Sequence, residues 1–303
     1  MLQSPLNYTG GKYKLLPQIL PLFPKNINTF VDLFCGGCNV GINVECNSVI
    51  YNDLDKHLFY LYKTFKENDI TLILNKIYKI IRKYNLSLVG ENGYEYYGCQ
   101  SGEGLSKYNK EAYLKLRNDF NTKKKKDFNY YIMLYVLIVY GFNNQIRFNL
   151  KGEFNLPVGK RDFNKKMEEK LIAFISKIQE QDCTFIHQDF RKFNISSLST
   201  EDFVYIDPPY LITCATYNEQ NAWNEKDEKD LLTFLDKLNA KNIRFALSNV
   251  LRSKGKENTI LINWLNKNSS KYIIHNLKYN YSNSNYHTKD KISKSEEVLI
   301  TNY

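Results

Sequence analysis

Short apolar runs alternate with longer amphipathic segments over much of this chain. The apolar runs end in polar or glycine-rich turns, a pattern typical of buried strands. The predicted strands are residues 29–34, 49–53, 183–187, 203–206, 244–248, 271–278 and 297–302. Apolar residues spaced along one helix face predict helices at residues 165–181, 224–239 and 259–265. Strands that alternate with helices predict an α/β protein with a Rossmann-like sheet.

Residues 58–162 interrupt this alternation. Their apolar spacing predicts successive helices, at residues 59–66, 70–84, 110–120 and 128–140. Residues 90–104 are glycine-rich and have no period, so we expect a loop there. We therefore predict an inserted, mainly helical domain at 58–162, within a discontinuous main domain made of 1–57 and 163–303.

The strand at residues 203–206 ends abruptly at Asp207-Pro208-Pro209-Tyr210. Two successive prolines cannot donate to a sheet ladder and they restrict the backbone, so Asp207 and the Pro208 carbonyl should stand rigidly at the strand's carboxyl end. Two acceptors beside an aromatic ring suit a nucleobase amine, which has two N–H donors and a face on which Tyr210 can stack. By itself, the motif is equally consistent with a turn that only ends a strand.

Two other strand ends carry groups that suit a nucleoside. The strand at 29–34 runs into Cys35-Gly36-Gly37, with a helix predicted beyond this turn, and the glycines let a ligand press against the backbone. The strand at 49–53 ends in Asp53, at a position that commonly holds ribose hydroxyls. Neither a G-x-G-x-x-G pattern nor a phosphate loop is present, so the pattern predicts an adenosyl compound without a diphosphate.

Asp189 and Phe190 follow the strand at 183–187. Ligands of such sheets bind beyond the carboxyl ends of the strands, so Asp189 could accept from a cofactor's adenine amine while Phe190 stacks on its ring. The alternative is that Asp189 caps the turn that follows. We interpret His187 as structural.

A glycine turn near the amino end leads into a predicted short helix. It consists of Asn7-Tyr8-Thr9-Gly10-Gly11-Lys12. Such turns expose backbone N–H groups, and Lys12 adds a positive charge, which suits a carboxylate or a phosphate. A flexible turn without a ligand is the alternative.

The amino-acid composition suggests a polyanionic partner. The formal net charge is +10, which suggests that the partner is nucleic acid. The 24 tyrosines suit stacking on bases, although a genome of low GC content would produce the same abundance of tyrosine. The longest apolar run, at residues 130–140, is too short to span a bilayer, and no signal segment is recognised, so we expect a cytoplasmic protein. The six cysteines show no paired framework or zinc pattern, so we predict free thiols and no metal.

Four of these motifs, in this order and spacing, resemble a known family. They are Asn7-Tyr8-Thr9-Gly10-Gly11-Lys12, Asp32-Leu33-Phe34-Cys35-Gly36-Gly37, Asn52-Asp53 and Asp207-Pro208-Pro209-Tyr210. They are similar to the motifs of Dam-type, class D12, alpha-group site-specific DNA adenine-N6 methyltransferases. The resemblance covers nearly the whole chain. It departs from the family at Cys38, where members often have glycine.

The resemblance implies methyl transfer from S-adenosylmethionine to the exocyclic amine of an extruded adenine in double-stranded DNA. The target adenine would be held by Asp207, Pro208, Pro209 and Tyr210, and Lys12 would contact the carboxylate end of the cofactor. With the residues proposed above, the predicted cofactor contacts are Tyr8, Lys12, Phe34, Gly36, Asp53, Asp189, Phe190 and Asp207.

Residues 140–160 are predicted to end the insertion in a hairpin. Two apolar-alternating arms flank Leu150-Lys151-Gly152-Glu153, which supplies the turn. Polar side chains in the arms can read base edges, and the stretch resembles the target-recognition segment of Dam-like enzymes. An ordinary hairpin with polar edges is the alternative. The predicted DNA contacts are Phe142, Asn143, Asn144, Arg147, Asn149 and Lys151.

Two other functions stay open at this point. The methyl acceptor could instead be an RNA base, a cytosine amine or a protein amide, each of which would be held in the pocket by the same kind of contacts. A non-catalytic DNA-binding protein could also keep the same fold. For the favoured reaction we expect a monomer, associated with the nucleoid through double-stranded DNA, in Dam-like methylation or beside a separate cognate restriction endonuclease. The hairpin does not fix the recognised base sequence.

Overall fold

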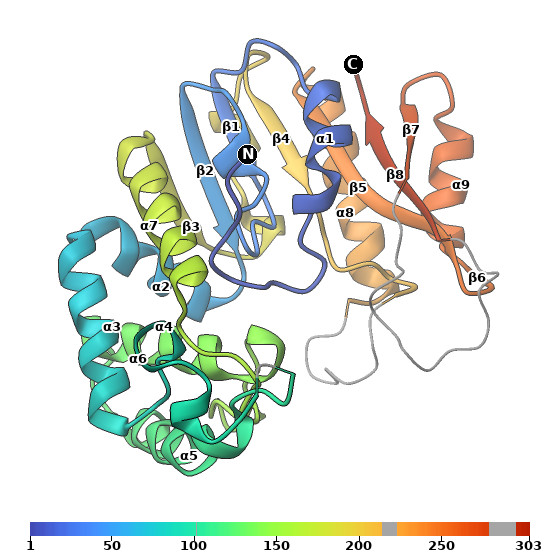
Figure 1. Ribbon diagram of the computed structural model, residues 1–303. Helices are drawn as coiled ribbons and strands as arrows, with labels where there is room; N and C mark the ends of the chain where they lie inside the picture. The colour runs from blue at the N-terminus through green and yellow to red at the C-terminus, as the bar shows by residue number, and fades with distance from the viewer. Residues whose placement is uncertain (101, 214–222, 279–294) are drawn as a thin grey trace. The chain divides into compact units, whose positions relative to one another are not determined.

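The structure is a computed structural model that describes residues 1–100, 102–213, 223–278 and 295–303 (Figure 1). The chain divides into two compact units. The helical unit comprises Met1–Gly11, Gly36–Asn43 and Asp55–Phe185, and the sheet unit comprises Lys12–Cys35, Val44–Leu54 and Ile186–Tyr303. These bounds differ from those of the predicted insertion, whose status as a separate domain stays a prediction.

A mostly parallel sheet runs in the order β3-β2-β1-β4-β5-β8-β7, with β6 paired to β5 (Figure 1). Strands β2, β1, β4 and β5 are parallel, whereas β8 is antiparallel to both β5 and β7. The predicted α/β class is therefore confirmed. The strands are β1 (Thr29–Asp32), β2 (Ser48–Asp53), β3 (Cys183–His187), β4 (Phe203–Ile206), β5 (Arg244–Ser253), β6 (Lys256–Glu257), β7 (Ile273–Leu277) and β8 (Glu296–Thr301).

Side chains of the central strand β4 alternate between the two faces of the sheet. Val204 and Ile206 belong to a buried apolar cluster that includes α8 and α9, whereas Tyr205 faces Phe23, with 5.6 Å between the ring centres. Because every residue of β4 is buried, its carboxyl end is fixed in place. The helices of this unit are α1 (Leu16–Ile19), α8 (Glu225–Ala240) and α9 (Thr259–Lys267). The 3-10 turns η6 (Phe190–Lys192) and η7 (Ile195–Ser197) lie between β3 and β4.

The helical unit is built around α6, in which residues 130–140 are all buried. Helices α2, α3 and α5 pack against it, which explains why it is apolar on every side and confirms the predicted buried helix. Asp127 caps its amino end by accepting from the Tyr130 N–H. The helices are α2 (Lys56–Glu67), α3 (Ile70–Tyr84), α4 (Val89–Asn92), α5 (Ser106–Thr122), α6 (Phe128–Tyr140) and α7 (Lys165–Glu180).

One of the predicted helices is interrupted, and another is shorter than expected. The helix after Lys12 is divided into η1 (Tyr13–Leu15), α1 and η2 (Leu20–Leu22), because Pro17 and Pro21 supply no N–H for a continuous ladder. The helix expected after the glycine turn is only a 3-10 turn, η3 (Gly41–Asn43). The turn itself takes up most of the connection, since β2 already begins at Ser48.

The loop predicted at residues 90–104 is wrong in part. Most of α4 and the 3-10 turn η4 (Glu95–Tyr97) lie within it, and each is ended by a glycine with positive φ, Gly93 and Gly98. Single turns of this length are too short to show a hydrophobic period, so the sequence pattern missed them.

Five cysteines in the described part of the chain are free thiols, and Cys214 lies outside it. Within the described ranges, no group of His, Cys, Asp and Glu side chains is arranged to hold a metal ion. The same ranges contain no helix with the length and apolar character of a membrane span.

Candidate active site

Asp207 directly follows β4, which lies between β1 and β5. Its side chain is 17% exposed, and its Oδ1 atom receives two donors, the Lys12 ammonium at 2.9 Å and the Tyr210 hydroxyl at 3.0 Å. Among the residues that the structure describes, Oδ2 has no hydrogen-bond partner. Pro208 is buried and Pro209 is exposed. One oxygen thus anchors the carboxylate, and the other stays available as an acceptor.

A second carboxylate, Glu297 of β8, lies against the same two donors. Its Oε1 atom is 3.7 Å from Lys12 Nζ and 3.4 Å from the Tyr210 hydroxyl oxygen. The Lys12 ammonium is also 4.8 Å from the centre of the Tyr210 ring. We name Lys12, Asp207, Tyr210 and Glu297 the carboxylate–lysine cluster. Sequence reasoning missed Glu297, although a glutamate among the apolar residues of β8 was an available signal.

Burial controls the ionisation of this cluster. It raises the pKa of the Asp207 carboxyl above its ordinary value, and the nearby Lys12 ammonium opposes that shift. Burial, with the charges of Asp207 and Glu297, raises the pKa of the Tyr210 hydroxyl well above its ordinary range. The hydroxyl therefore stays protonated and donates to Asp207.

Three aromatic rings gather near the carboxyl end of β1. The ring centres of Phe34 and Phe190 are 5.4 Å apart, and the Trp223 ring lies 5.8 Å from each. The indole N–H of Trp223 donates to the buried carboxylate of Glu228 at 2.6 Å, which fixes the ring. The structure thus brings together two predicted cofactor residues and adds Trp223, which no sequence motif marked. Phe34 and Trp223 are partly exposed and offer an apolar surface to a planar ligand, whereas Phe190 is buried against them.

The ends of β1 and β2 are fastened to each other beside Asp53. The Asn52 side chain donates to the Leu33 carbonyl at 2.9 Å, and the Cys35 N–H donates to the Asn52 carbonyl at 2.8 Å. Within the described chain, the buried Oδ1 atom of Asn52 has no hydrogen-bond partner. Asp53 is the last residue of β2 and is half-buried, so this strand end presents oxygen acceptors.

Asp189 caps the turn η6, as one of its two interpretations predicted. Its Oδ1 atom accepts from the Arg191 N–H at 2.9 Å, and its Oδ2 atom accepts from the Arg191 guanidinium at 2.8 Å. The same guanidinium contacts Asp227 and Asp230. The capping role is confirmed, and the contact of Asp189 with an adenine amine stays a prediction. The His187 ring lies 2.9 Å from the Leu54 carbonyl, in agreement with a structural role.

In the helical unit, the Tyr8 ring lies directly over Gly36. Gly36 has φ +46°, and a Cβ atom placed there would be 2.7 Å from the ring, so the contact requires glycine. The Tyr62 hydroxyl donates to the Gly36 carbonyl at 2.6 Å. Cys38 has φ +59°, the left-handed conformation that favours the glycine of the resembling family.

The segment after α6 presents an exposed aromatic ring on a tightly held backbone. Phe142 is 49% exposed, and Asn143 and Asn144 both have positive φ. The Asn7 side chain donates to the Asn143 carbonyl at 2.8 Å. Asn144 is buried, and its amide donates to two carbonyls at the end of α6. This arrangement favours a structural role for Asn144, whose DNA contact stays a prediction.

The predicted hairpin is present, closed by a bond from the Asn149 N–H to the Glu153 carbonyl at 2.8 Å. The Asn149 side chain is used within the turn, where it accepts from the Lys151 and Glu153 N–H groups. Arg147 is exposed, and two bonds of 2.9 Å to Asn155 orient its guanidinium. Arg147 and Lys151 therefore project charge from a fixed hairpin.

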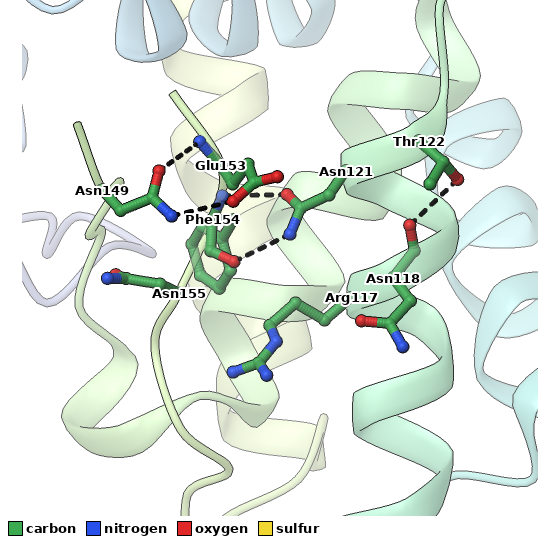
Figure 2. Close-up of a pocket in the computed structure, with 8 residues that line it drawn as sticks. All are labelled: Arg117, Asn118, Asn121, Thr122, Asn149, Glu153, Phe154 and Asn155. Carbon is green, nitrogen blue, oxygen red and sulfur yellow. Dashed lines mark hydrogen bonds between the residues drawn. The ribbon is translucent and has the colours of Figure 1, made fainter. Parts of the chain in front are cut away.

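Helix α5 supports this hairpin from one side (Figure 2). The Asn121 side chain accepts from the Phe154 N–H at 2.8 Å and donates to the Phe154 carbonyl at 3.0 Å, as a neighbouring strand would. A pocket of about 340 Å³ lies between them. Its lining residues are Arg117, Asn118, Asn121, Thr122, Asn149, Glu153, Phe154 and Asn155.

Known proteins of one family are similar in sequence to this chain. The family model for D12 class N6 adenine-specific DNA methyltransferases matches residues 8–283, and the chain belongs to this family. All of the chain aligns with the type II methyltransferase M.FokI of Planomicrobium okeanokoites at 43% identity and with the modification methylase StsI of Streptococcus sanguinis at 42% identity. The chain covers 43% of the length of each of these two relatives. A DNA adenine methylase of Salmonella typhi is 26% identical over 80% of the chain and 79% of its own length.

Proposed function

We propose that this chain transfers a methyl group from S-adenosylmethionine to N6 of an adenine within a specific sequence of double-stranded DNA. Membership of the family supports the reaction class. The observation that carries the proposal is the available Oδ2 atom of Asp207, fixed beside the Pro208 carbonyl at the end of β4. Two rigid acceptors match the two N–H donors of an exocyclic amine.

In the proposed reaction the protein positions the adenine and forms no covalent bond to it. An adenine leaves the duplex at a cost of a few kcal/mol, and Asp207 and Pro208 accept the hydrogens of its amine while Tyr210 contacts the ring. The nitrogen lone pair then points away from both acceptors. As the N–CH3 bond forms, the carbon–sulfur bond breaks, and one amine proton is released.

The sheet unit contains residues that fit the cofactor. Phe34 and Trp223, which pack against the buried Phe190, present an apolar surface for its adenine. Asp53 presents a carboxylate for its ribose, beside the Asn52 Oδ1 atom, which has no hydrogen-bond partner in the described part of the chain. When bound, S-adenosylmethionine supplies a methyl group activated by a positively charged sulfur. Tyr8 and Gly36 stay predicted contacts, and Lys12, which pairs with Asp207 here, stays a predicted contact for the carboxylate end.

The recognition of DNA is proposed to use the segment after α6. Phe142 offers an exposed ring for stacking on bases, and Arg147 and Lys151 offer cations for base edges and phosphates. Because two relatives are named as type II or modification methylases, we propose a role in restriction–modification, beside a separate endonuclease. The monomeric state, the cytoplasmic location and the association with the nucleoid stay predictions.

The experiment that tests the proposed function is incubation of the purified protein with labelled S-adenosylmethionine and unmethylated DNA. Nucleosides from the digested DNA are then separated by mass spectrometry. We expect label in N6-methyladenine only. Label in N4-methylcytosine, or transfer to RNA or protein but not DNA, would assign another acceptor, and cofactor binding without transfer would support a non-catalytic protein.

Loss of the Arg147 side chain is expected to reduce sequence discrimination. Arg147→Ala should lower kcat/KM on the recognised sequence by a factor equivalent to roughly 1–3 kcal/mol, and lower it less on sites with one changed base pair. The measurement is kcat/KM on matched duplexes that differ at single positions. Arg82→Ala, which removes an exposed arginine on α3, is the control and should leave both values unchanged. An equal loss on all duplexes would instead indicate a phosphate contact.

Cofactor binding is expected to change the fluorescence of Trp223. The chain has two tryptophans, so Trp264→Phe leaves Trp223 as the single reporter. In that background, S-adenosylmethionine should quench the emission, and Phe34→Leu should weaken binding by roughly 1 kcal/mol or more, because a stacking surface is lost. Tyr96→Leu, at an exposed aromatic of the helical unit, is the control. An affinity unchanged by Phe34→Leu would show that the three rings do not bind the cofactor.

A further inference from the structure

We propose that Glu297 is a positioning residue for methyl transfer, which shares the Lys12 ammonium with Asp207 and thereby keeps Asp207 a strong acceptor. The inference rests on the proposed function and adds to it a residue that lies outside the four family motifs. It is carried by the geometry of the carboxylate–lysine cluster, in which one ammonium and one hydroxyl lie between two carboxylates.

The position of Glu297 is an unfavourable one for a charge. Its side chain is 4% exposed, on a strand that lies between β5 and β7, and its register partners are Val250 and Leu277. The residues that follow it, Val298, Leu299 and Ile300, are fully buried. Removing a carboxylate from water costs free energy, whereas an apolar side chain would fill this position without that cost. Glu297 therefore has a role that depends on its charge and not only on packing.

The role of Glu297 follows from the charges around Lys12. If Lys12 faced Asp207 alone, a close ion pair would neutralise the carboxylate and weaken its attraction for the amine hydrogens. Glu297 lies on the same ammonium at 3.7 Å, so the cluster contains one positive and two negative groups. The second negative charge, that of Glu297, lies beside the place where the amine hydrogens are to be accepted and where a positively charged methyl donor is to approach. Electrostatic interactions of this kind are strong in sites from which water is excluded.

Glu297 also restricts the orientation of Tyr210. The Tyr210 hydroxyl is held at 3.0 Å by Asp207, and Glu297 lies slightly farther away, at 3.4 Å. With Lys12 against the ring, the side chain has contacts at its tip and on its face. The ring that is proposed to contact the target base is therefore oriented before the base arrives, which reduces the entropy lost in the reaction.

Glu297→Gln tests the charge because it keeps the size of the side chain and an oxygen acceptor. We expect kcat to fall by about tenfold or more, equivalent to one pKa unit or more of lost interaction, with little change in KM for DNA or for S-adenosylmethionine. We also expect the acid limb of the kcat profile to move to lower pH, because losing a neighbouring negative charge lowers the pKa of Asp207. Glu296→Gln is the matched control. Glu296 precedes Glu297 on β8, is 38% exposed and pairs with Arg252 at 2.8 Å, so wild-type kinetics are expected.

Glu297→Asp separates charge from packing, including the case in which the glutamine variant folds poorly. Aspartate keeps the charge but is one methylene shorter. If charge is the task, Glu297→Asp transfers methyl groups faster than Glu297→Gln and keeps the wild-type acid limb. If packing is the task, Glu297→Asp is the worse variant and neither acid limb moves, which overturns the inference. A wild-type kcat and acid limb in Glu297→Gln also overturn it, while the proposed function stands. A wild-type protein that forms no N6-methyladenine overturns the proposed function itself.

Discussion

Asp207→Asn is expected to lower kcat for methyl transfer by about 10²–10³-fold, while S-adenosylmethionine still binds within a few-fold of the wild-type affinity. An amide has one oxygen, whereas the proposed reaction needs Oδ1 to stay on Lys12 and Tyr210 while Oδ2 accepts from the amine. The measurement is single-turnover methylation at saturating DNA and cofactor, with cofactor affinity determined separately.

Asp236→Asn is a suitable control for this change. Asp236 lies on α8, where it accepts hydrogen bonds from Trp264 and Tyr272 and not from any member of the carboxylate–lysine cluster. It should leave kcat unchanged. If Asp207→Asn keeps more than about a tenth of the wild-type kcat, the carboxylate is not the main acceptor of the amine hydrogens.

Lys12→Met is expected to lower the free energy of unfolding by about 3–5 kcal/mol near neutral pH, because it leaves the buried carboxylate of Glu297 and the mostly buried carboxylate of Asp207 without their shared cation. Without Lys12, the pKa of Asp207 rises further above its ordinary value, so the folded protein binds protons more readily than the unfolded chain. Stability of the variant then falls as pH rises through this window, and its deficit relative to wild type shrinks as pH is lowered.

Urea unfolding of both proteins at several pH values measures this effect. Lys14→Met removes an exposed lysine two residues away and should change the free energy of unfolding by no more than about 0.5 kcal/mol. A Lys12→Met deficit that stays constant with pH would mean that Lys12 stabilises the protein by packing and not by its charge.

Local sequence patterns predicted the residues that end strands. The run from Phe203 to Ile206 is short, apolar and stopped by two prolines, so both the strand and the place of Asp207 could be read directly. Local patterns also predicted β3, α3 and α6, and the observed bounds of these three elements match the predicted ones. In each case the signal lies within the element itself.

Contacts between distant strands could not be predicted in this way. Glu297 reaches Lys12 and Tyr210 because β8 inserts antiparallel between β5 and β7, and no local pattern specifies that order. The sequence also could not show whether a polar side chain binds a ligand or a nearby backbone group. Asp189 and Asn144 both satisfy nearby backbone groups, and only the three-dimensional contacts show this use.

The proposed reaction depends above all on Asp207, which accepts a hydrogen bond from the amine of the adenine that receives the methyl group. The most direct test is to methylate unmethylated genomic DNA with wild-type protein and with Asp207→Asn in parallel, and to map modified bases at single-nucleotide resolution. We expect N6-methyladenine at one recurring sequence with the wild type, and almost none with the variant. Modification on another base, or equal N6-methyladenine from both proteins, would contradict it.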